Sequence, residues 1–590
     1  MTTHDFARHR AWRWILLVTL LMALGALWAC ASNGGDDDDD AAEETDDDDD
    51  DTEEEFDPNH FTLGAPGTGD EEPTGRLIGW NIGRGTYYAA SDDPFHGDGS
   101  EFGDWNTPSR EAAMQSFSLL RPGTGETPYM RFSGLQIDGN LGADGYHFWN
   151  FVDPDRVAAD TDNMAVFNYM DFIDKSDCLP TVTLNFGSGT AAEAGDYAQY
   201  LNGTGVNKYV LARKNWGPDS PYNQKIFEIG NEVYGAWNTG YGAGSVYPYS
   251  YANPDAVNGG DPDWYNKPSK NAANFAARAL EYIDEVQKVT PDAEFWVPLS
   301  QATMDAWGGL TSAINDLNPL LTDPAVTAVV IHHYKVDDLK NLGWDGKNDP
   351  RLLIAGAEPF HAKFQQLKSA LAAIPRETPL KVAVTEYHTA GAFSSFEFDR
   401  EDQPIVGLGI ADMLILYAQE DVDIAMQHMA VLFESTSELL FEKWYNPFRY
   451  IDSKLVEMPS FVVTKLIANH LLERRADLRT EQAQETTVSV NSVSFTYPIL
   501  TAVAFHAADG GESTIIVLNR DLESEREFTV DLPADPQAES GSIYAPSTYE
   551  ENASFSKPGI KSWNGFEVNG TRLTATIPPH SVAAIRLTWP

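Results

Sequence analysis

The feature that most constrains the fold is a series of apolar segments, each followed by a segment of helical pattern, between residue 75 and residue 478. Segments that are largely apolar and rich in β-branched residues are typical of strands buried on both faces of a parallel sheet. Eight of them occur, at residues 76–82, 128–134, 179–187, 225–232, 294–300, 326–334, 381–388 and 424–432. Eight such units over about 400 residues predict an α/β fold, a (β/α)8 TIM barrel with insertions. A doubly wound open sheet is the alternative.

The helices between these strands are predicted from apolar residues at helical spacing. Residues 274–289 and the segment from Phe364 to Ile374 each place their apolar residues on one face. The last helix of the barrel is predicted over residues 460–475.

The pattern changes near residue 479, where short apolar runs alternate with turn signals such as Asp509-Gly510. This pattern predicts antiparallel strands of a C-terminal β-sandwich. We expect the sandwich to pack on the barrel, and a sugar-binding surface is the alternative role. The predicted organisation is therefore a signal peptide at 1–30, an acidic disordered linker at 31–74, the barrel at 75–478 and the sandwich at 479–590.

The N-terminal residues have the pattern of an export signal. Three arginines precede an apolar run at residues 15–29, which is too short for a comfortable membrane span. The run ends in LWAC, which resembles a bacterial lipoprotein processing box and implies cleavage before Cys30 and lipid attachment to its thiol. An uncleaved anchor or an ordinary signal is the alternative. Each of these predicts a protein of the cell envelope, membrane-anchored at the periplasmic or cell surface, or a secreted one.

An acidic tract follows the signal. Residues 36–57 contain 17 Asp or Glu and no Lys or Arg. Such a tract repels itself and has nothing to bury, so it predicts an extended linker, with calcium binding as the alternative. The formal net charge of the chain is −49, which argues against nucleic acid as a partner.

Polar residues cluster where the predicted strands end. In a TIM barrel the chemistry lies at the C-terminal ends of the strands. Glu232 ends the fourth strand and Glu386 lies near the end of the seventh, so both are expected to face one open mouth. The other polar residues placed there are Arg131, Asn231, His332, His333, Tyr334 and Gln427.

Two carboxylates across a cleft are the working groups of a glycosidase. One must carry a proton for the leaving oxygen, and the other must be ionised to attack the anomeric carbon. Asn231 is suited to a sugar hydroxyl, and Tyr334 is expected to hold Glu386 in its attacking orientation. Ten of the 15 tryptophans lie between Trp80 and Trp444, which favours a polysaccharide or oligosaccharide substrate. No cofactor is predicted.

His332 and His333 are adjacent, so on a strand their side chains point to opposite faces. One is expected to line the site and the other to pack against the core. No metal site is predicted from this pair.

The segment from Tyr200 to Trp237 resembles glycoside hydrolase family 51 (GH51), the α-L-arabinofuranosidases, in the clan GH-A of (β/α)8 retaining glycosidases. The resemblance extends over the barrel and into the sandwich. It implies that Glu232 is the general acid/base, that Glu386 is the nucleophile and that the anomeric configuration is retained. The matching residues are Tyr200, Asn202, Gly203, Arg213, Gly217, Pro221, Tyr222, Glu228, Gly230, Asn231, Glu232, Gly235 and Trp237.

The chain departs from the family pattern at three positions of the sugar pocket. Arg131 is kept, but Trp80 stands where a sugar-binding Glu is usual, Gln136 replaces Asn and Glu442 replaces Gln. With Trp237, these residues are the expected sugar contacts that the resemblance implies. The departures predict weak activity on simple α-L-arabinofuranosides.

Two alternatives to an arabinofuranosidase stay open. The first is another activity of the clan, such as a β-xylosidase, a β-glucuronidase or an endoglucanase. The second is a non-catalytic carbohydrate-binding surface lipoprotein on a decayed barrel. Both glutamates are present in their motifs, which favours the enzyme.

Overall fold

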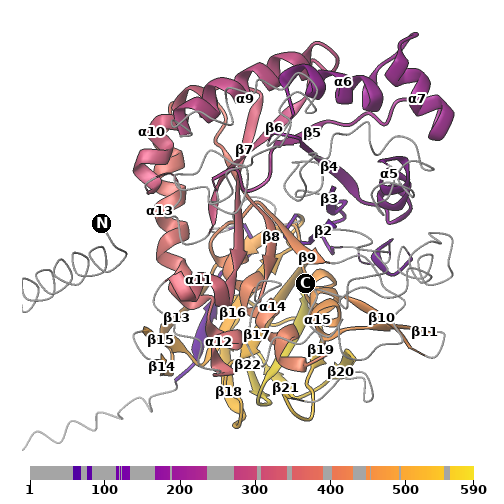
Figure 1. Ribbon diagram of the computed structural model, residues 1–590. Helices are drawn as coiled ribbons and strands as arrows, with labels where there is room; N and C mark the ends of the chain where they lie inside the picture. The colour runs from indigo at the N-terminus through magenta and orange to yellow at the C-terminus, as the bar shows by residue number, and fades with distance from the viewer. Residues whose placement is uncertain are drawn as a thin grey trace, which may run out of the picture. The chain divides into compact units, whose positions relative to one another are not determined.

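The structure is a computed structural model that describes most of the chain after residue 57. The described residues are 58–67, 76–82, 115–118, 120, 122–132, 166–186, 189–234, 272–301, 307, 309–341, 349–389, 402–429, 447–451, 454–490, 493–550 and 559–590. They belong to one compact unit, Asp57–Pro590. Figure 1 shows its barrel strands enclosed by helices, with the C-terminal strands on one side.

Eight parallel strands form a closed barrel in chain order, with β9 paired to β2. Each predicted strand is present, which confirms the (β/α)8 fold. Their bounds are β2 (Gly79–Ile82), β3 (Tyr129–Phe132), β4 (Leu179–Leu184), β5 (Ile226–Ile229), β6 (Glu294–Gln301), β7 (Val326–Tyr334), β8 (Lys381–His388) and β9 (Ile424–Met429).

Helices form the outer layer of the barrel (Figure 1). Among the described residues they are α5 (Val166–Lys175), α6 (Ala191–Asn202), α7 (Lys208–Trp216), α9 (Ala272–Gln287), α10 (Leu310–Leu321), α11 (Lys335–Asn341), α12 (Arg351–Ala355), η4 (Glu358–Phe360), α13 (His361–Ala372), α14 (Pro404–Gln419) and α15 (Pro459–Ala468). The helix expected over residues 460–475 ends at Ala468, because Arg474–Ala476 leaves it to pair with a sandwich strand. Of the helices in the described part of the chain, none is both long and apolar enough to cross a membrane.

The barrel interior changes character along its axis. Towards the N-terminal ends of the strands it is filled by an apolar cluster that includes Tyr129, Trp296 and Met426. Further along the same strands, Arg131 and Glu228 face inward and are buried. The apolar layer supplies the packing energy, and the polar layer lies above it at the end where TIM barrels carry their sites.

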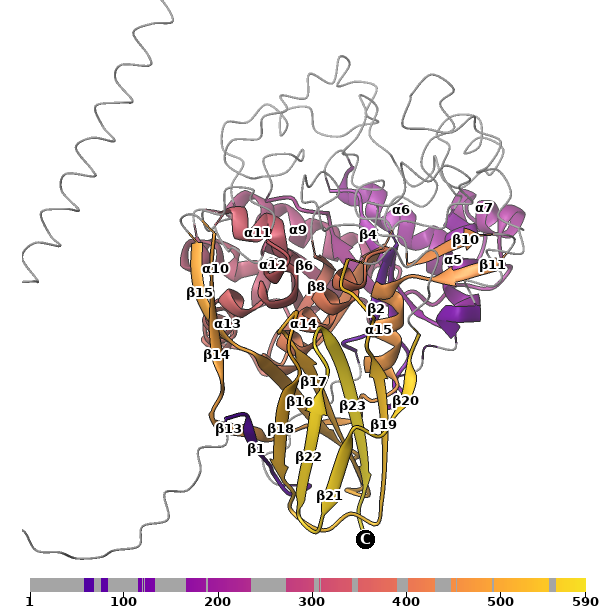
Figure 2. The same ribbon diagram turned by 90° about the horizontal axis from the view of Figure 1, so that it is seen from below.

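The C-terminal domain is a β-sandwich of two sheets, in the orders β13-β1-β18-β22-β21 and β12-β16-β17-β23-β19-β20. Helices α14 and α15 lie between it and the barrel strands (Figure 2). Its strands are β1 (His60–Leu63), β12 (Arg474–Ala476), β13 (Leu478–Gln482), β16 (Leu500–His506), β17 (Glu512–Asn519), β18 (Arg526–Asp531), β19 (Ala538–Tyr544), β20 (Lys561–Trp563), β21 (Phe566–Asn569), β22 (Arg572–Ile577) and β23 (Ser581–Thr588). Two hairpins stand apart, β10 (Phe448–Ile451) with β11 (Lys454–Glu457), and β14 (Glu485–Val490) with β15 (Val493–Pro498).

Two expected domain boundaries need correction. Strand β1 lies inside the segment 31–74 that was predicted to be a disordered linker, and it pairs with β13 and β18. Its Phe61 and Leu63 are buried in the sandwich core, which supplies the burial that a linker lacks. The sandwich also begins before residue 479, because β12 pairs with β16.

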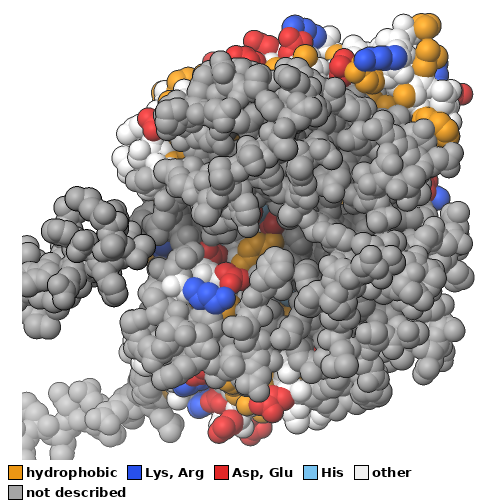
Figure 3. Space-filling view, in the orientation of Figure 1, with side chains coloured by type: hydrophobic (Ala, Val, Ile, Leu, Met, Phe, Trp, Pro, Cys, Tyr) orange, Lys and Arg blue, Asp and Glu red, His pale blue; other side chains and the backbone are white. Residues whose placement is uncertain are grey.

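Exposed apolar side chains occur on the helical layer at α7. Val206, Leu211 and Trp216 are 86%, 47% and 37% exposed. Hydrophobic side chains are visible over α6 and α7 in Figure 3. Two of these side chains, Leu211 and Trp216, belong to α7, and Val206 lies just before it.

Candidate active site

The end of β5 carries backbone strain where the chemistry is expected. Gly230 and Glu232 both lie in the left-handed region, with φ of +80° and +47°. Glycine adopts this conformation at little cost, but for Glu232 it costs on the order of 1 kcal/mol or more. The turn places Glu232 just beyond the strand, at the C-terminal end of the barrel.

Arg131 is the centre of a buried polar cluster. Its Nε and Nη2 donate to the two carboxylate oxygens of Glu228 at 2.6 and 2.8 Å. Its Nη1 donates to Asn81 Oδ1 at 3.0 Å, and its Nη2 also donates to Asn231 Oδ1 at 2.7 Å. Burial opposes the charge of Arg131, but Glu228 and Glu386 outweigh it and raise the pKa of its guanidinium.

Glu386 is held at both carboxylate oxygens. Arg131 Nη1 donates to Oε1 at 2.6 Å, and the hydroxyl of Tyr334 donates to Oε2 at 2.7 Å. Both contacts stabilise the ionised carboxylate and fix its orientation. The hydrogen bond from Tyr334 is the one that the sequence predicted.

His332 connects the two glutamates. Its Nδ1 lies 2.8 Å from Glu232 Oε1 and 3.4 Å from Glu386 Oε2, and its Nε2 lies 3.2 Å from Thr385 Oγ1. Burial disfavours the imidazolium, but the charge of Glu386 and the hydrogen bond and charge of Glu232 outweigh it and raise the pKa of His332 above 6.5.

The two carboxylates lie close together. One oxygen of Glu232, one oxygen of Glu386 and one nitrogen of His332 lie within 4.8 Å of one another, and among the described residues this group could hold a metal ion. His332 and Glu232 are hydrogen-bonded to each other, and Glu386 accepts hydrogen bonds from Arg131 and Tyr334. The arrangement therefore supplies two carboxylates with different hydrogen-bonding partners at the C-terminal end of the barrel.

His333 faces the opposite way, as strand alternation predicts. Its ring packs against Phe360 and Phe364 in the helical layer, and its Nδ1 lies 2.9 Å from the hydroxyl of Tyr417. Burial, reinforced by the charge of Lys335, lowers the pKa of His333 to about 3. His333 is thus a neutral core residue, and His332 lines the site.

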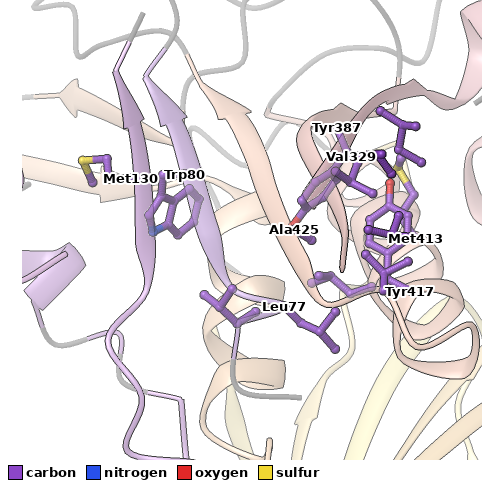
Figure 4. Packing of buried hydrophobic residues seen from close by; sticks show 14 of the residues in the cluster. Leu77, Trp80, Met130, Val329, Tyr387, Met413, Tyr417 and Ala425 are labelled. Atoms are coloured by element: carbon purple, nitrogen blue, oxygen red, sulfur yellow. The ribbon is translucent and has the colours of Figure 1, made fainter. Parts of the chain in front are cut away.

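Trp80 does not line a sugar pocket, which corrects the prediction. Its side chain is fully buried, with ring centroids 5.0 Å from Phe117 and 5.6 Å from Phe461. Figure 4 shows it beside Met130 on the neighbouring strand. Alternation along the strand explains this, because Asn81 takes the inward position and Trp80 the outward one.

Predictions for two other residues also need correction. Gln427 was placed at the barrel mouth, but its side-chain oxygen accepts a hydrogen bond from Thr464 of α15, on the outer side of the barrel. Arg131 was expected to bind substrate, but its side chain has no exposed surface and supports Glu386 from below.

Sequence reasoning missed the roles of Asn81 and Glu228. Glu228 was noted only as part of the family motif, although a charged residue in the middle of the apolar strand Ile226–Ile229 was itself a signal. Asn81 and Arg131 are register partners on β2 and β3, so they lie at one level of the barrel. That pairing could not be read from either strand alone.

Four predicted site residues lie outside the described residues. They are Cys30, Gln136, Trp237 and Glu442. Their expected roles remain predictions.

Comparisons with known proteins find α-L-arabinofuranosidases both in sequence and in structure. No family model matches the chain. A probable α-L-arabinofuranosidase C from Aspergillus flavus is 31% identical over 122 residues, and the α-L-arabinofuranosidase C of Emericella nidulans is 30% identical over 122 residues. These matches cover 19% of this chain and 23% of each relative, so the chain spans less than a quarter of the curated relatives that it matches.

Similarity of structure is far more extensive. The α-L-arabinofuranosidase of Thermotoga maritima, solved with arabinose, matches with a TM-score of 0.64 over 90% of this chain and 99% of that one, at 16% identity. A xyloglucanase of glycoside hydrolase family 44 from Paenibacillus polymyxa matches with a TM-score of 0.51 over 90% and 99%, at 10% identity. In fold over most of its length, and in sequence over a shorter stretch, the chain resembles the α-L-arabinofuranosidases of glycoside hydrolase family 51.

Proposed function

We propose that this protein is a retaining glycoside hydrolase of the α-L-arabinofuranosidase type. The observation that carries the proposal is the pair Glu232 and Glu386, whose nearest oxygens lie within 4.8 Å at the C-terminal end of the barrel. Retaining glycosidases hold their carboxyl groups about 5–5.5 Å apart, whereas inverting ones leave room for a water at about 6.5–9.5 Å. The substrate is a polysaccharide-derived glycoside.

The two carboxylates take different parts in a double displacement. Glu386 attacks the anomeric carbon while Glu232 gives its proton to the departing oxygen, which leaves a covalent glycosyl-enzyme. Glu232 then takes a proton from water, and this water displaces Glu386 from the sugar. Arg131 and Tyr334 keep Glu386 ionised and aimed, and His332 holds Glu232 beside it.

The sugar specificity is tested with aryl α-L-arabinofuranoside, β-xyloside, β-glucoside, β-galactoside and β-glucuronide. Trp80 is buried outside the site, so one of the three departures no longer argues against arabinofuranosidase activity. The similarity to α-L-arabinofuranosidases in sequence and fold supports this sugar over the others, against the two remaining departures. We expect the arabinofuranoside to have the largest kcat/KM, by about tenfold or more, equivalent to about 1.4 kcal/mol. A lead by another sugar would transfer the assignment to another activity of the clan. Turnover of none would favour the non-catalytic carbohydrate-binding alternative.

Replacing Tyr334 by phenylalanine removes one hydrogen bond to a charged group. Such a bond contributes about 1.5–3 kcal/mol, so kcat should fall by about 10- to 150-fold. Tyr387→Phe is the matched control, because Tyr387 neighbours Glu386 but packs outward with Tyr417. Equal activity of the two variants would show that Tyr334 does not support the nucleophile.

We also propose that the chain is exported and lipid-anchored at Cys30, which rests on its N-terminal sequence. Cys30→Ser should move the protein from the membrane fraction to the soluble fraction or block its processing. Immunoblotting of fractionated cells measures this. Unchanged membrane association would show that the anchor is the uncleaved apolar segment.

A further inference from the structure

A buried ionic network connects the sandwich to helix α14 and to Lys335, the residue that follows β7 of the barrel. Asp412 of α14 accepts hydrogen bonds at Oδ1 from Nε and Nη2 of Arg520, at 3.0 and 2.6 Å. Its Oδ2 accepts from Lys335 Nζ at 2.7 Å and from the backbone of Ala357 at 3.0 Å. Arg520 follows β17 in the sandwich, and its Nη1 also donates to Glu358 Oε2 at 2.8 Å. All of these side chains except that of Glu358 are almost fully buried.

The network ends at a residue that adjoins the active site. Lys335 directly follows Tyr334, whose hydroxyl holds Glu386. The ammonium of Lys335 also donates to the backbone oxygens of Leu353 and Gly409, at 2.7 and 2.9 Å, so its position is fixed by α12 and α14. A displacement of Lys335 would therefore move the backbone that carries Tyr334.

Stability alone does not account for this arrangement. Removing charges from water is costly, and an apolar contact of the same size is often as stable as a buried ion pair or more so. Buried ionic groups do, however, impose a specific geometry, because each donor must meet its acceptor. Here the network fixes Lys335, and the residue before it is Tyr334, which is hydrogen-bonded to the proposed nucleophile Glu386.

We infer that Arg520, a residue of the sandwich, is a positioning residue for Glu386 and acts through Asp412, Lys335 and Tyr334. Arg520 provides both hydrogen bonds to Asp412 Oδ1. Without them, Asp412 is left in the core with Lys335 as its remaining cationic partner, and the carboxylate and ammonium settle into a new position. The inference rests on the proposed function and adds that the sandwich takes part in the geometry of catalysis.

The test replaces Arg520 by methionine, which has a similar reach and no charge. At a temperature where circular dichroism shows the variant to be folded, kcat should fall by about tenfold or more while KM stays within about twofold. In a Tyr334→Phe background the same substitution should change kcat by less than about twofold, because the path from Arg520 to Glu386 is already cut. If the role of Arg520 were purely structural, its substitution would lower stability, and its effect on kcat would be the same with and without the Tyr334 hydroxyl.

Two further variants complete the test. Arg526→Met is the matched control, because Arg526 lies in the same part of the sandwich but bonds to Asp521 and Gln484, and its kcat should equal that of the wild type. Arg520→Lys keeps the charge without the paired donors, so its kcat should lie between those of the wild type and the methionine variant. If Arg520→Met does not fold, Arg520→Lys is used in its place.

The inference is overturned if a folded Arg520→Met has wild-type kcat, or if its loss is equally large in the Tyr334→Phe background. A wild-type protein that turns over no glycoside would refute the proposed function separately. In that case the same two substitutions are compared by urea unfolding. If the shift in urea midpoint of the double variant differs from the sum of the shifts of the two single variants, the connection is supported. Additive shifts overturn it.

Discussion

Glu386→Gln is expected to reduce turnover of every substrate by about 10⁴-fold or more, equivalent to about 5 kcal/mol in the barrier. The amide has nearly the same shape: its oxygen can accept the hydrogen bond from Arg131, and its NH2 group can donate to the hydroxyl oxygen of Tyr334. It is not a nucleophile at the anomeric carbon, so no glycosyl-enzyme forms. The measurement is kcat on the best aryl glycoside, with purified protein shown to be folded by circular dichroism.

Glu294→Gln is the matched control for this prediction. Glu294 begins β6 at the opposite end of the same barrel and accepts a hydrogen bond from Thr327. The control should keep wild-type kcat. A Glu386→Gln variant with even about a tenth of the wild-type kcat, about 1.4 kcal/mol of barrier, would remove Glu386 from the role of nucleophile.

Glu232→Ala is expected to separate the two chemical steps. A dinitrophenyl leaving group needs little protonation, so its kcat/KM should fall by less than about tenfold. A phenyl or alkyl leaving group needs the proton, and its kcat/KM should fall by about 10²–10⁴-fold. On the dinitrophenyl substrate the second step should become slow for lack of a base, so kcat and KM should fall together.

Added azide provides a second test of the Glu232→Ala variant. Azide attacks the glycosyl-enzyme without a base, so it should restore kcat and yield a glycosyl azide of retained configuration. Rescue of Glu386→Gly would instead yield the inverted azide, because azide then attacks the substrate directly. Equal losses on good and poor leaving groups, without azide rescue, would exclude Glu232 as the acid/base.

The barrel could be predicted from the sequence because its strands are local and continuous. Each of the eight apolar runs is long enough to identify without knowing its neighbours, and the polar residues at the ends of β5 and β8 identify the two glutamates. Strand alternation also predicts that only one of His332 and His333 lines the site.

The sequence could not show which side chains point into the barrel on strands that are buried on both sides. In Gly79–Ile82, the apolar Trp80 and the polar Asn81 are adjacent on a strand of only four residues, and this short pattern does not show which one points inward. The answer lies in the pairing of Asn81 with Arg131 on the neighbouring strand. Strand β1 was missed for a related reason, since its four residues are ordered by β13 and β18, more than 400 residues away in the chain.

The central claim is that Glu232 and Glu386 hydrolyse glycosides by double displacement, and the configuration of the first product tests it most directly. Proton NMR of the reaction with the best aryl glycoside shows the anomer that forms before mutarotation mixes the two. We predict that the first sugar released has the same anomeric configuration as the substrate. A first product of inverted configuration would contradict the mechanism, because a single displacement by water needs no nucleophilic glutamate.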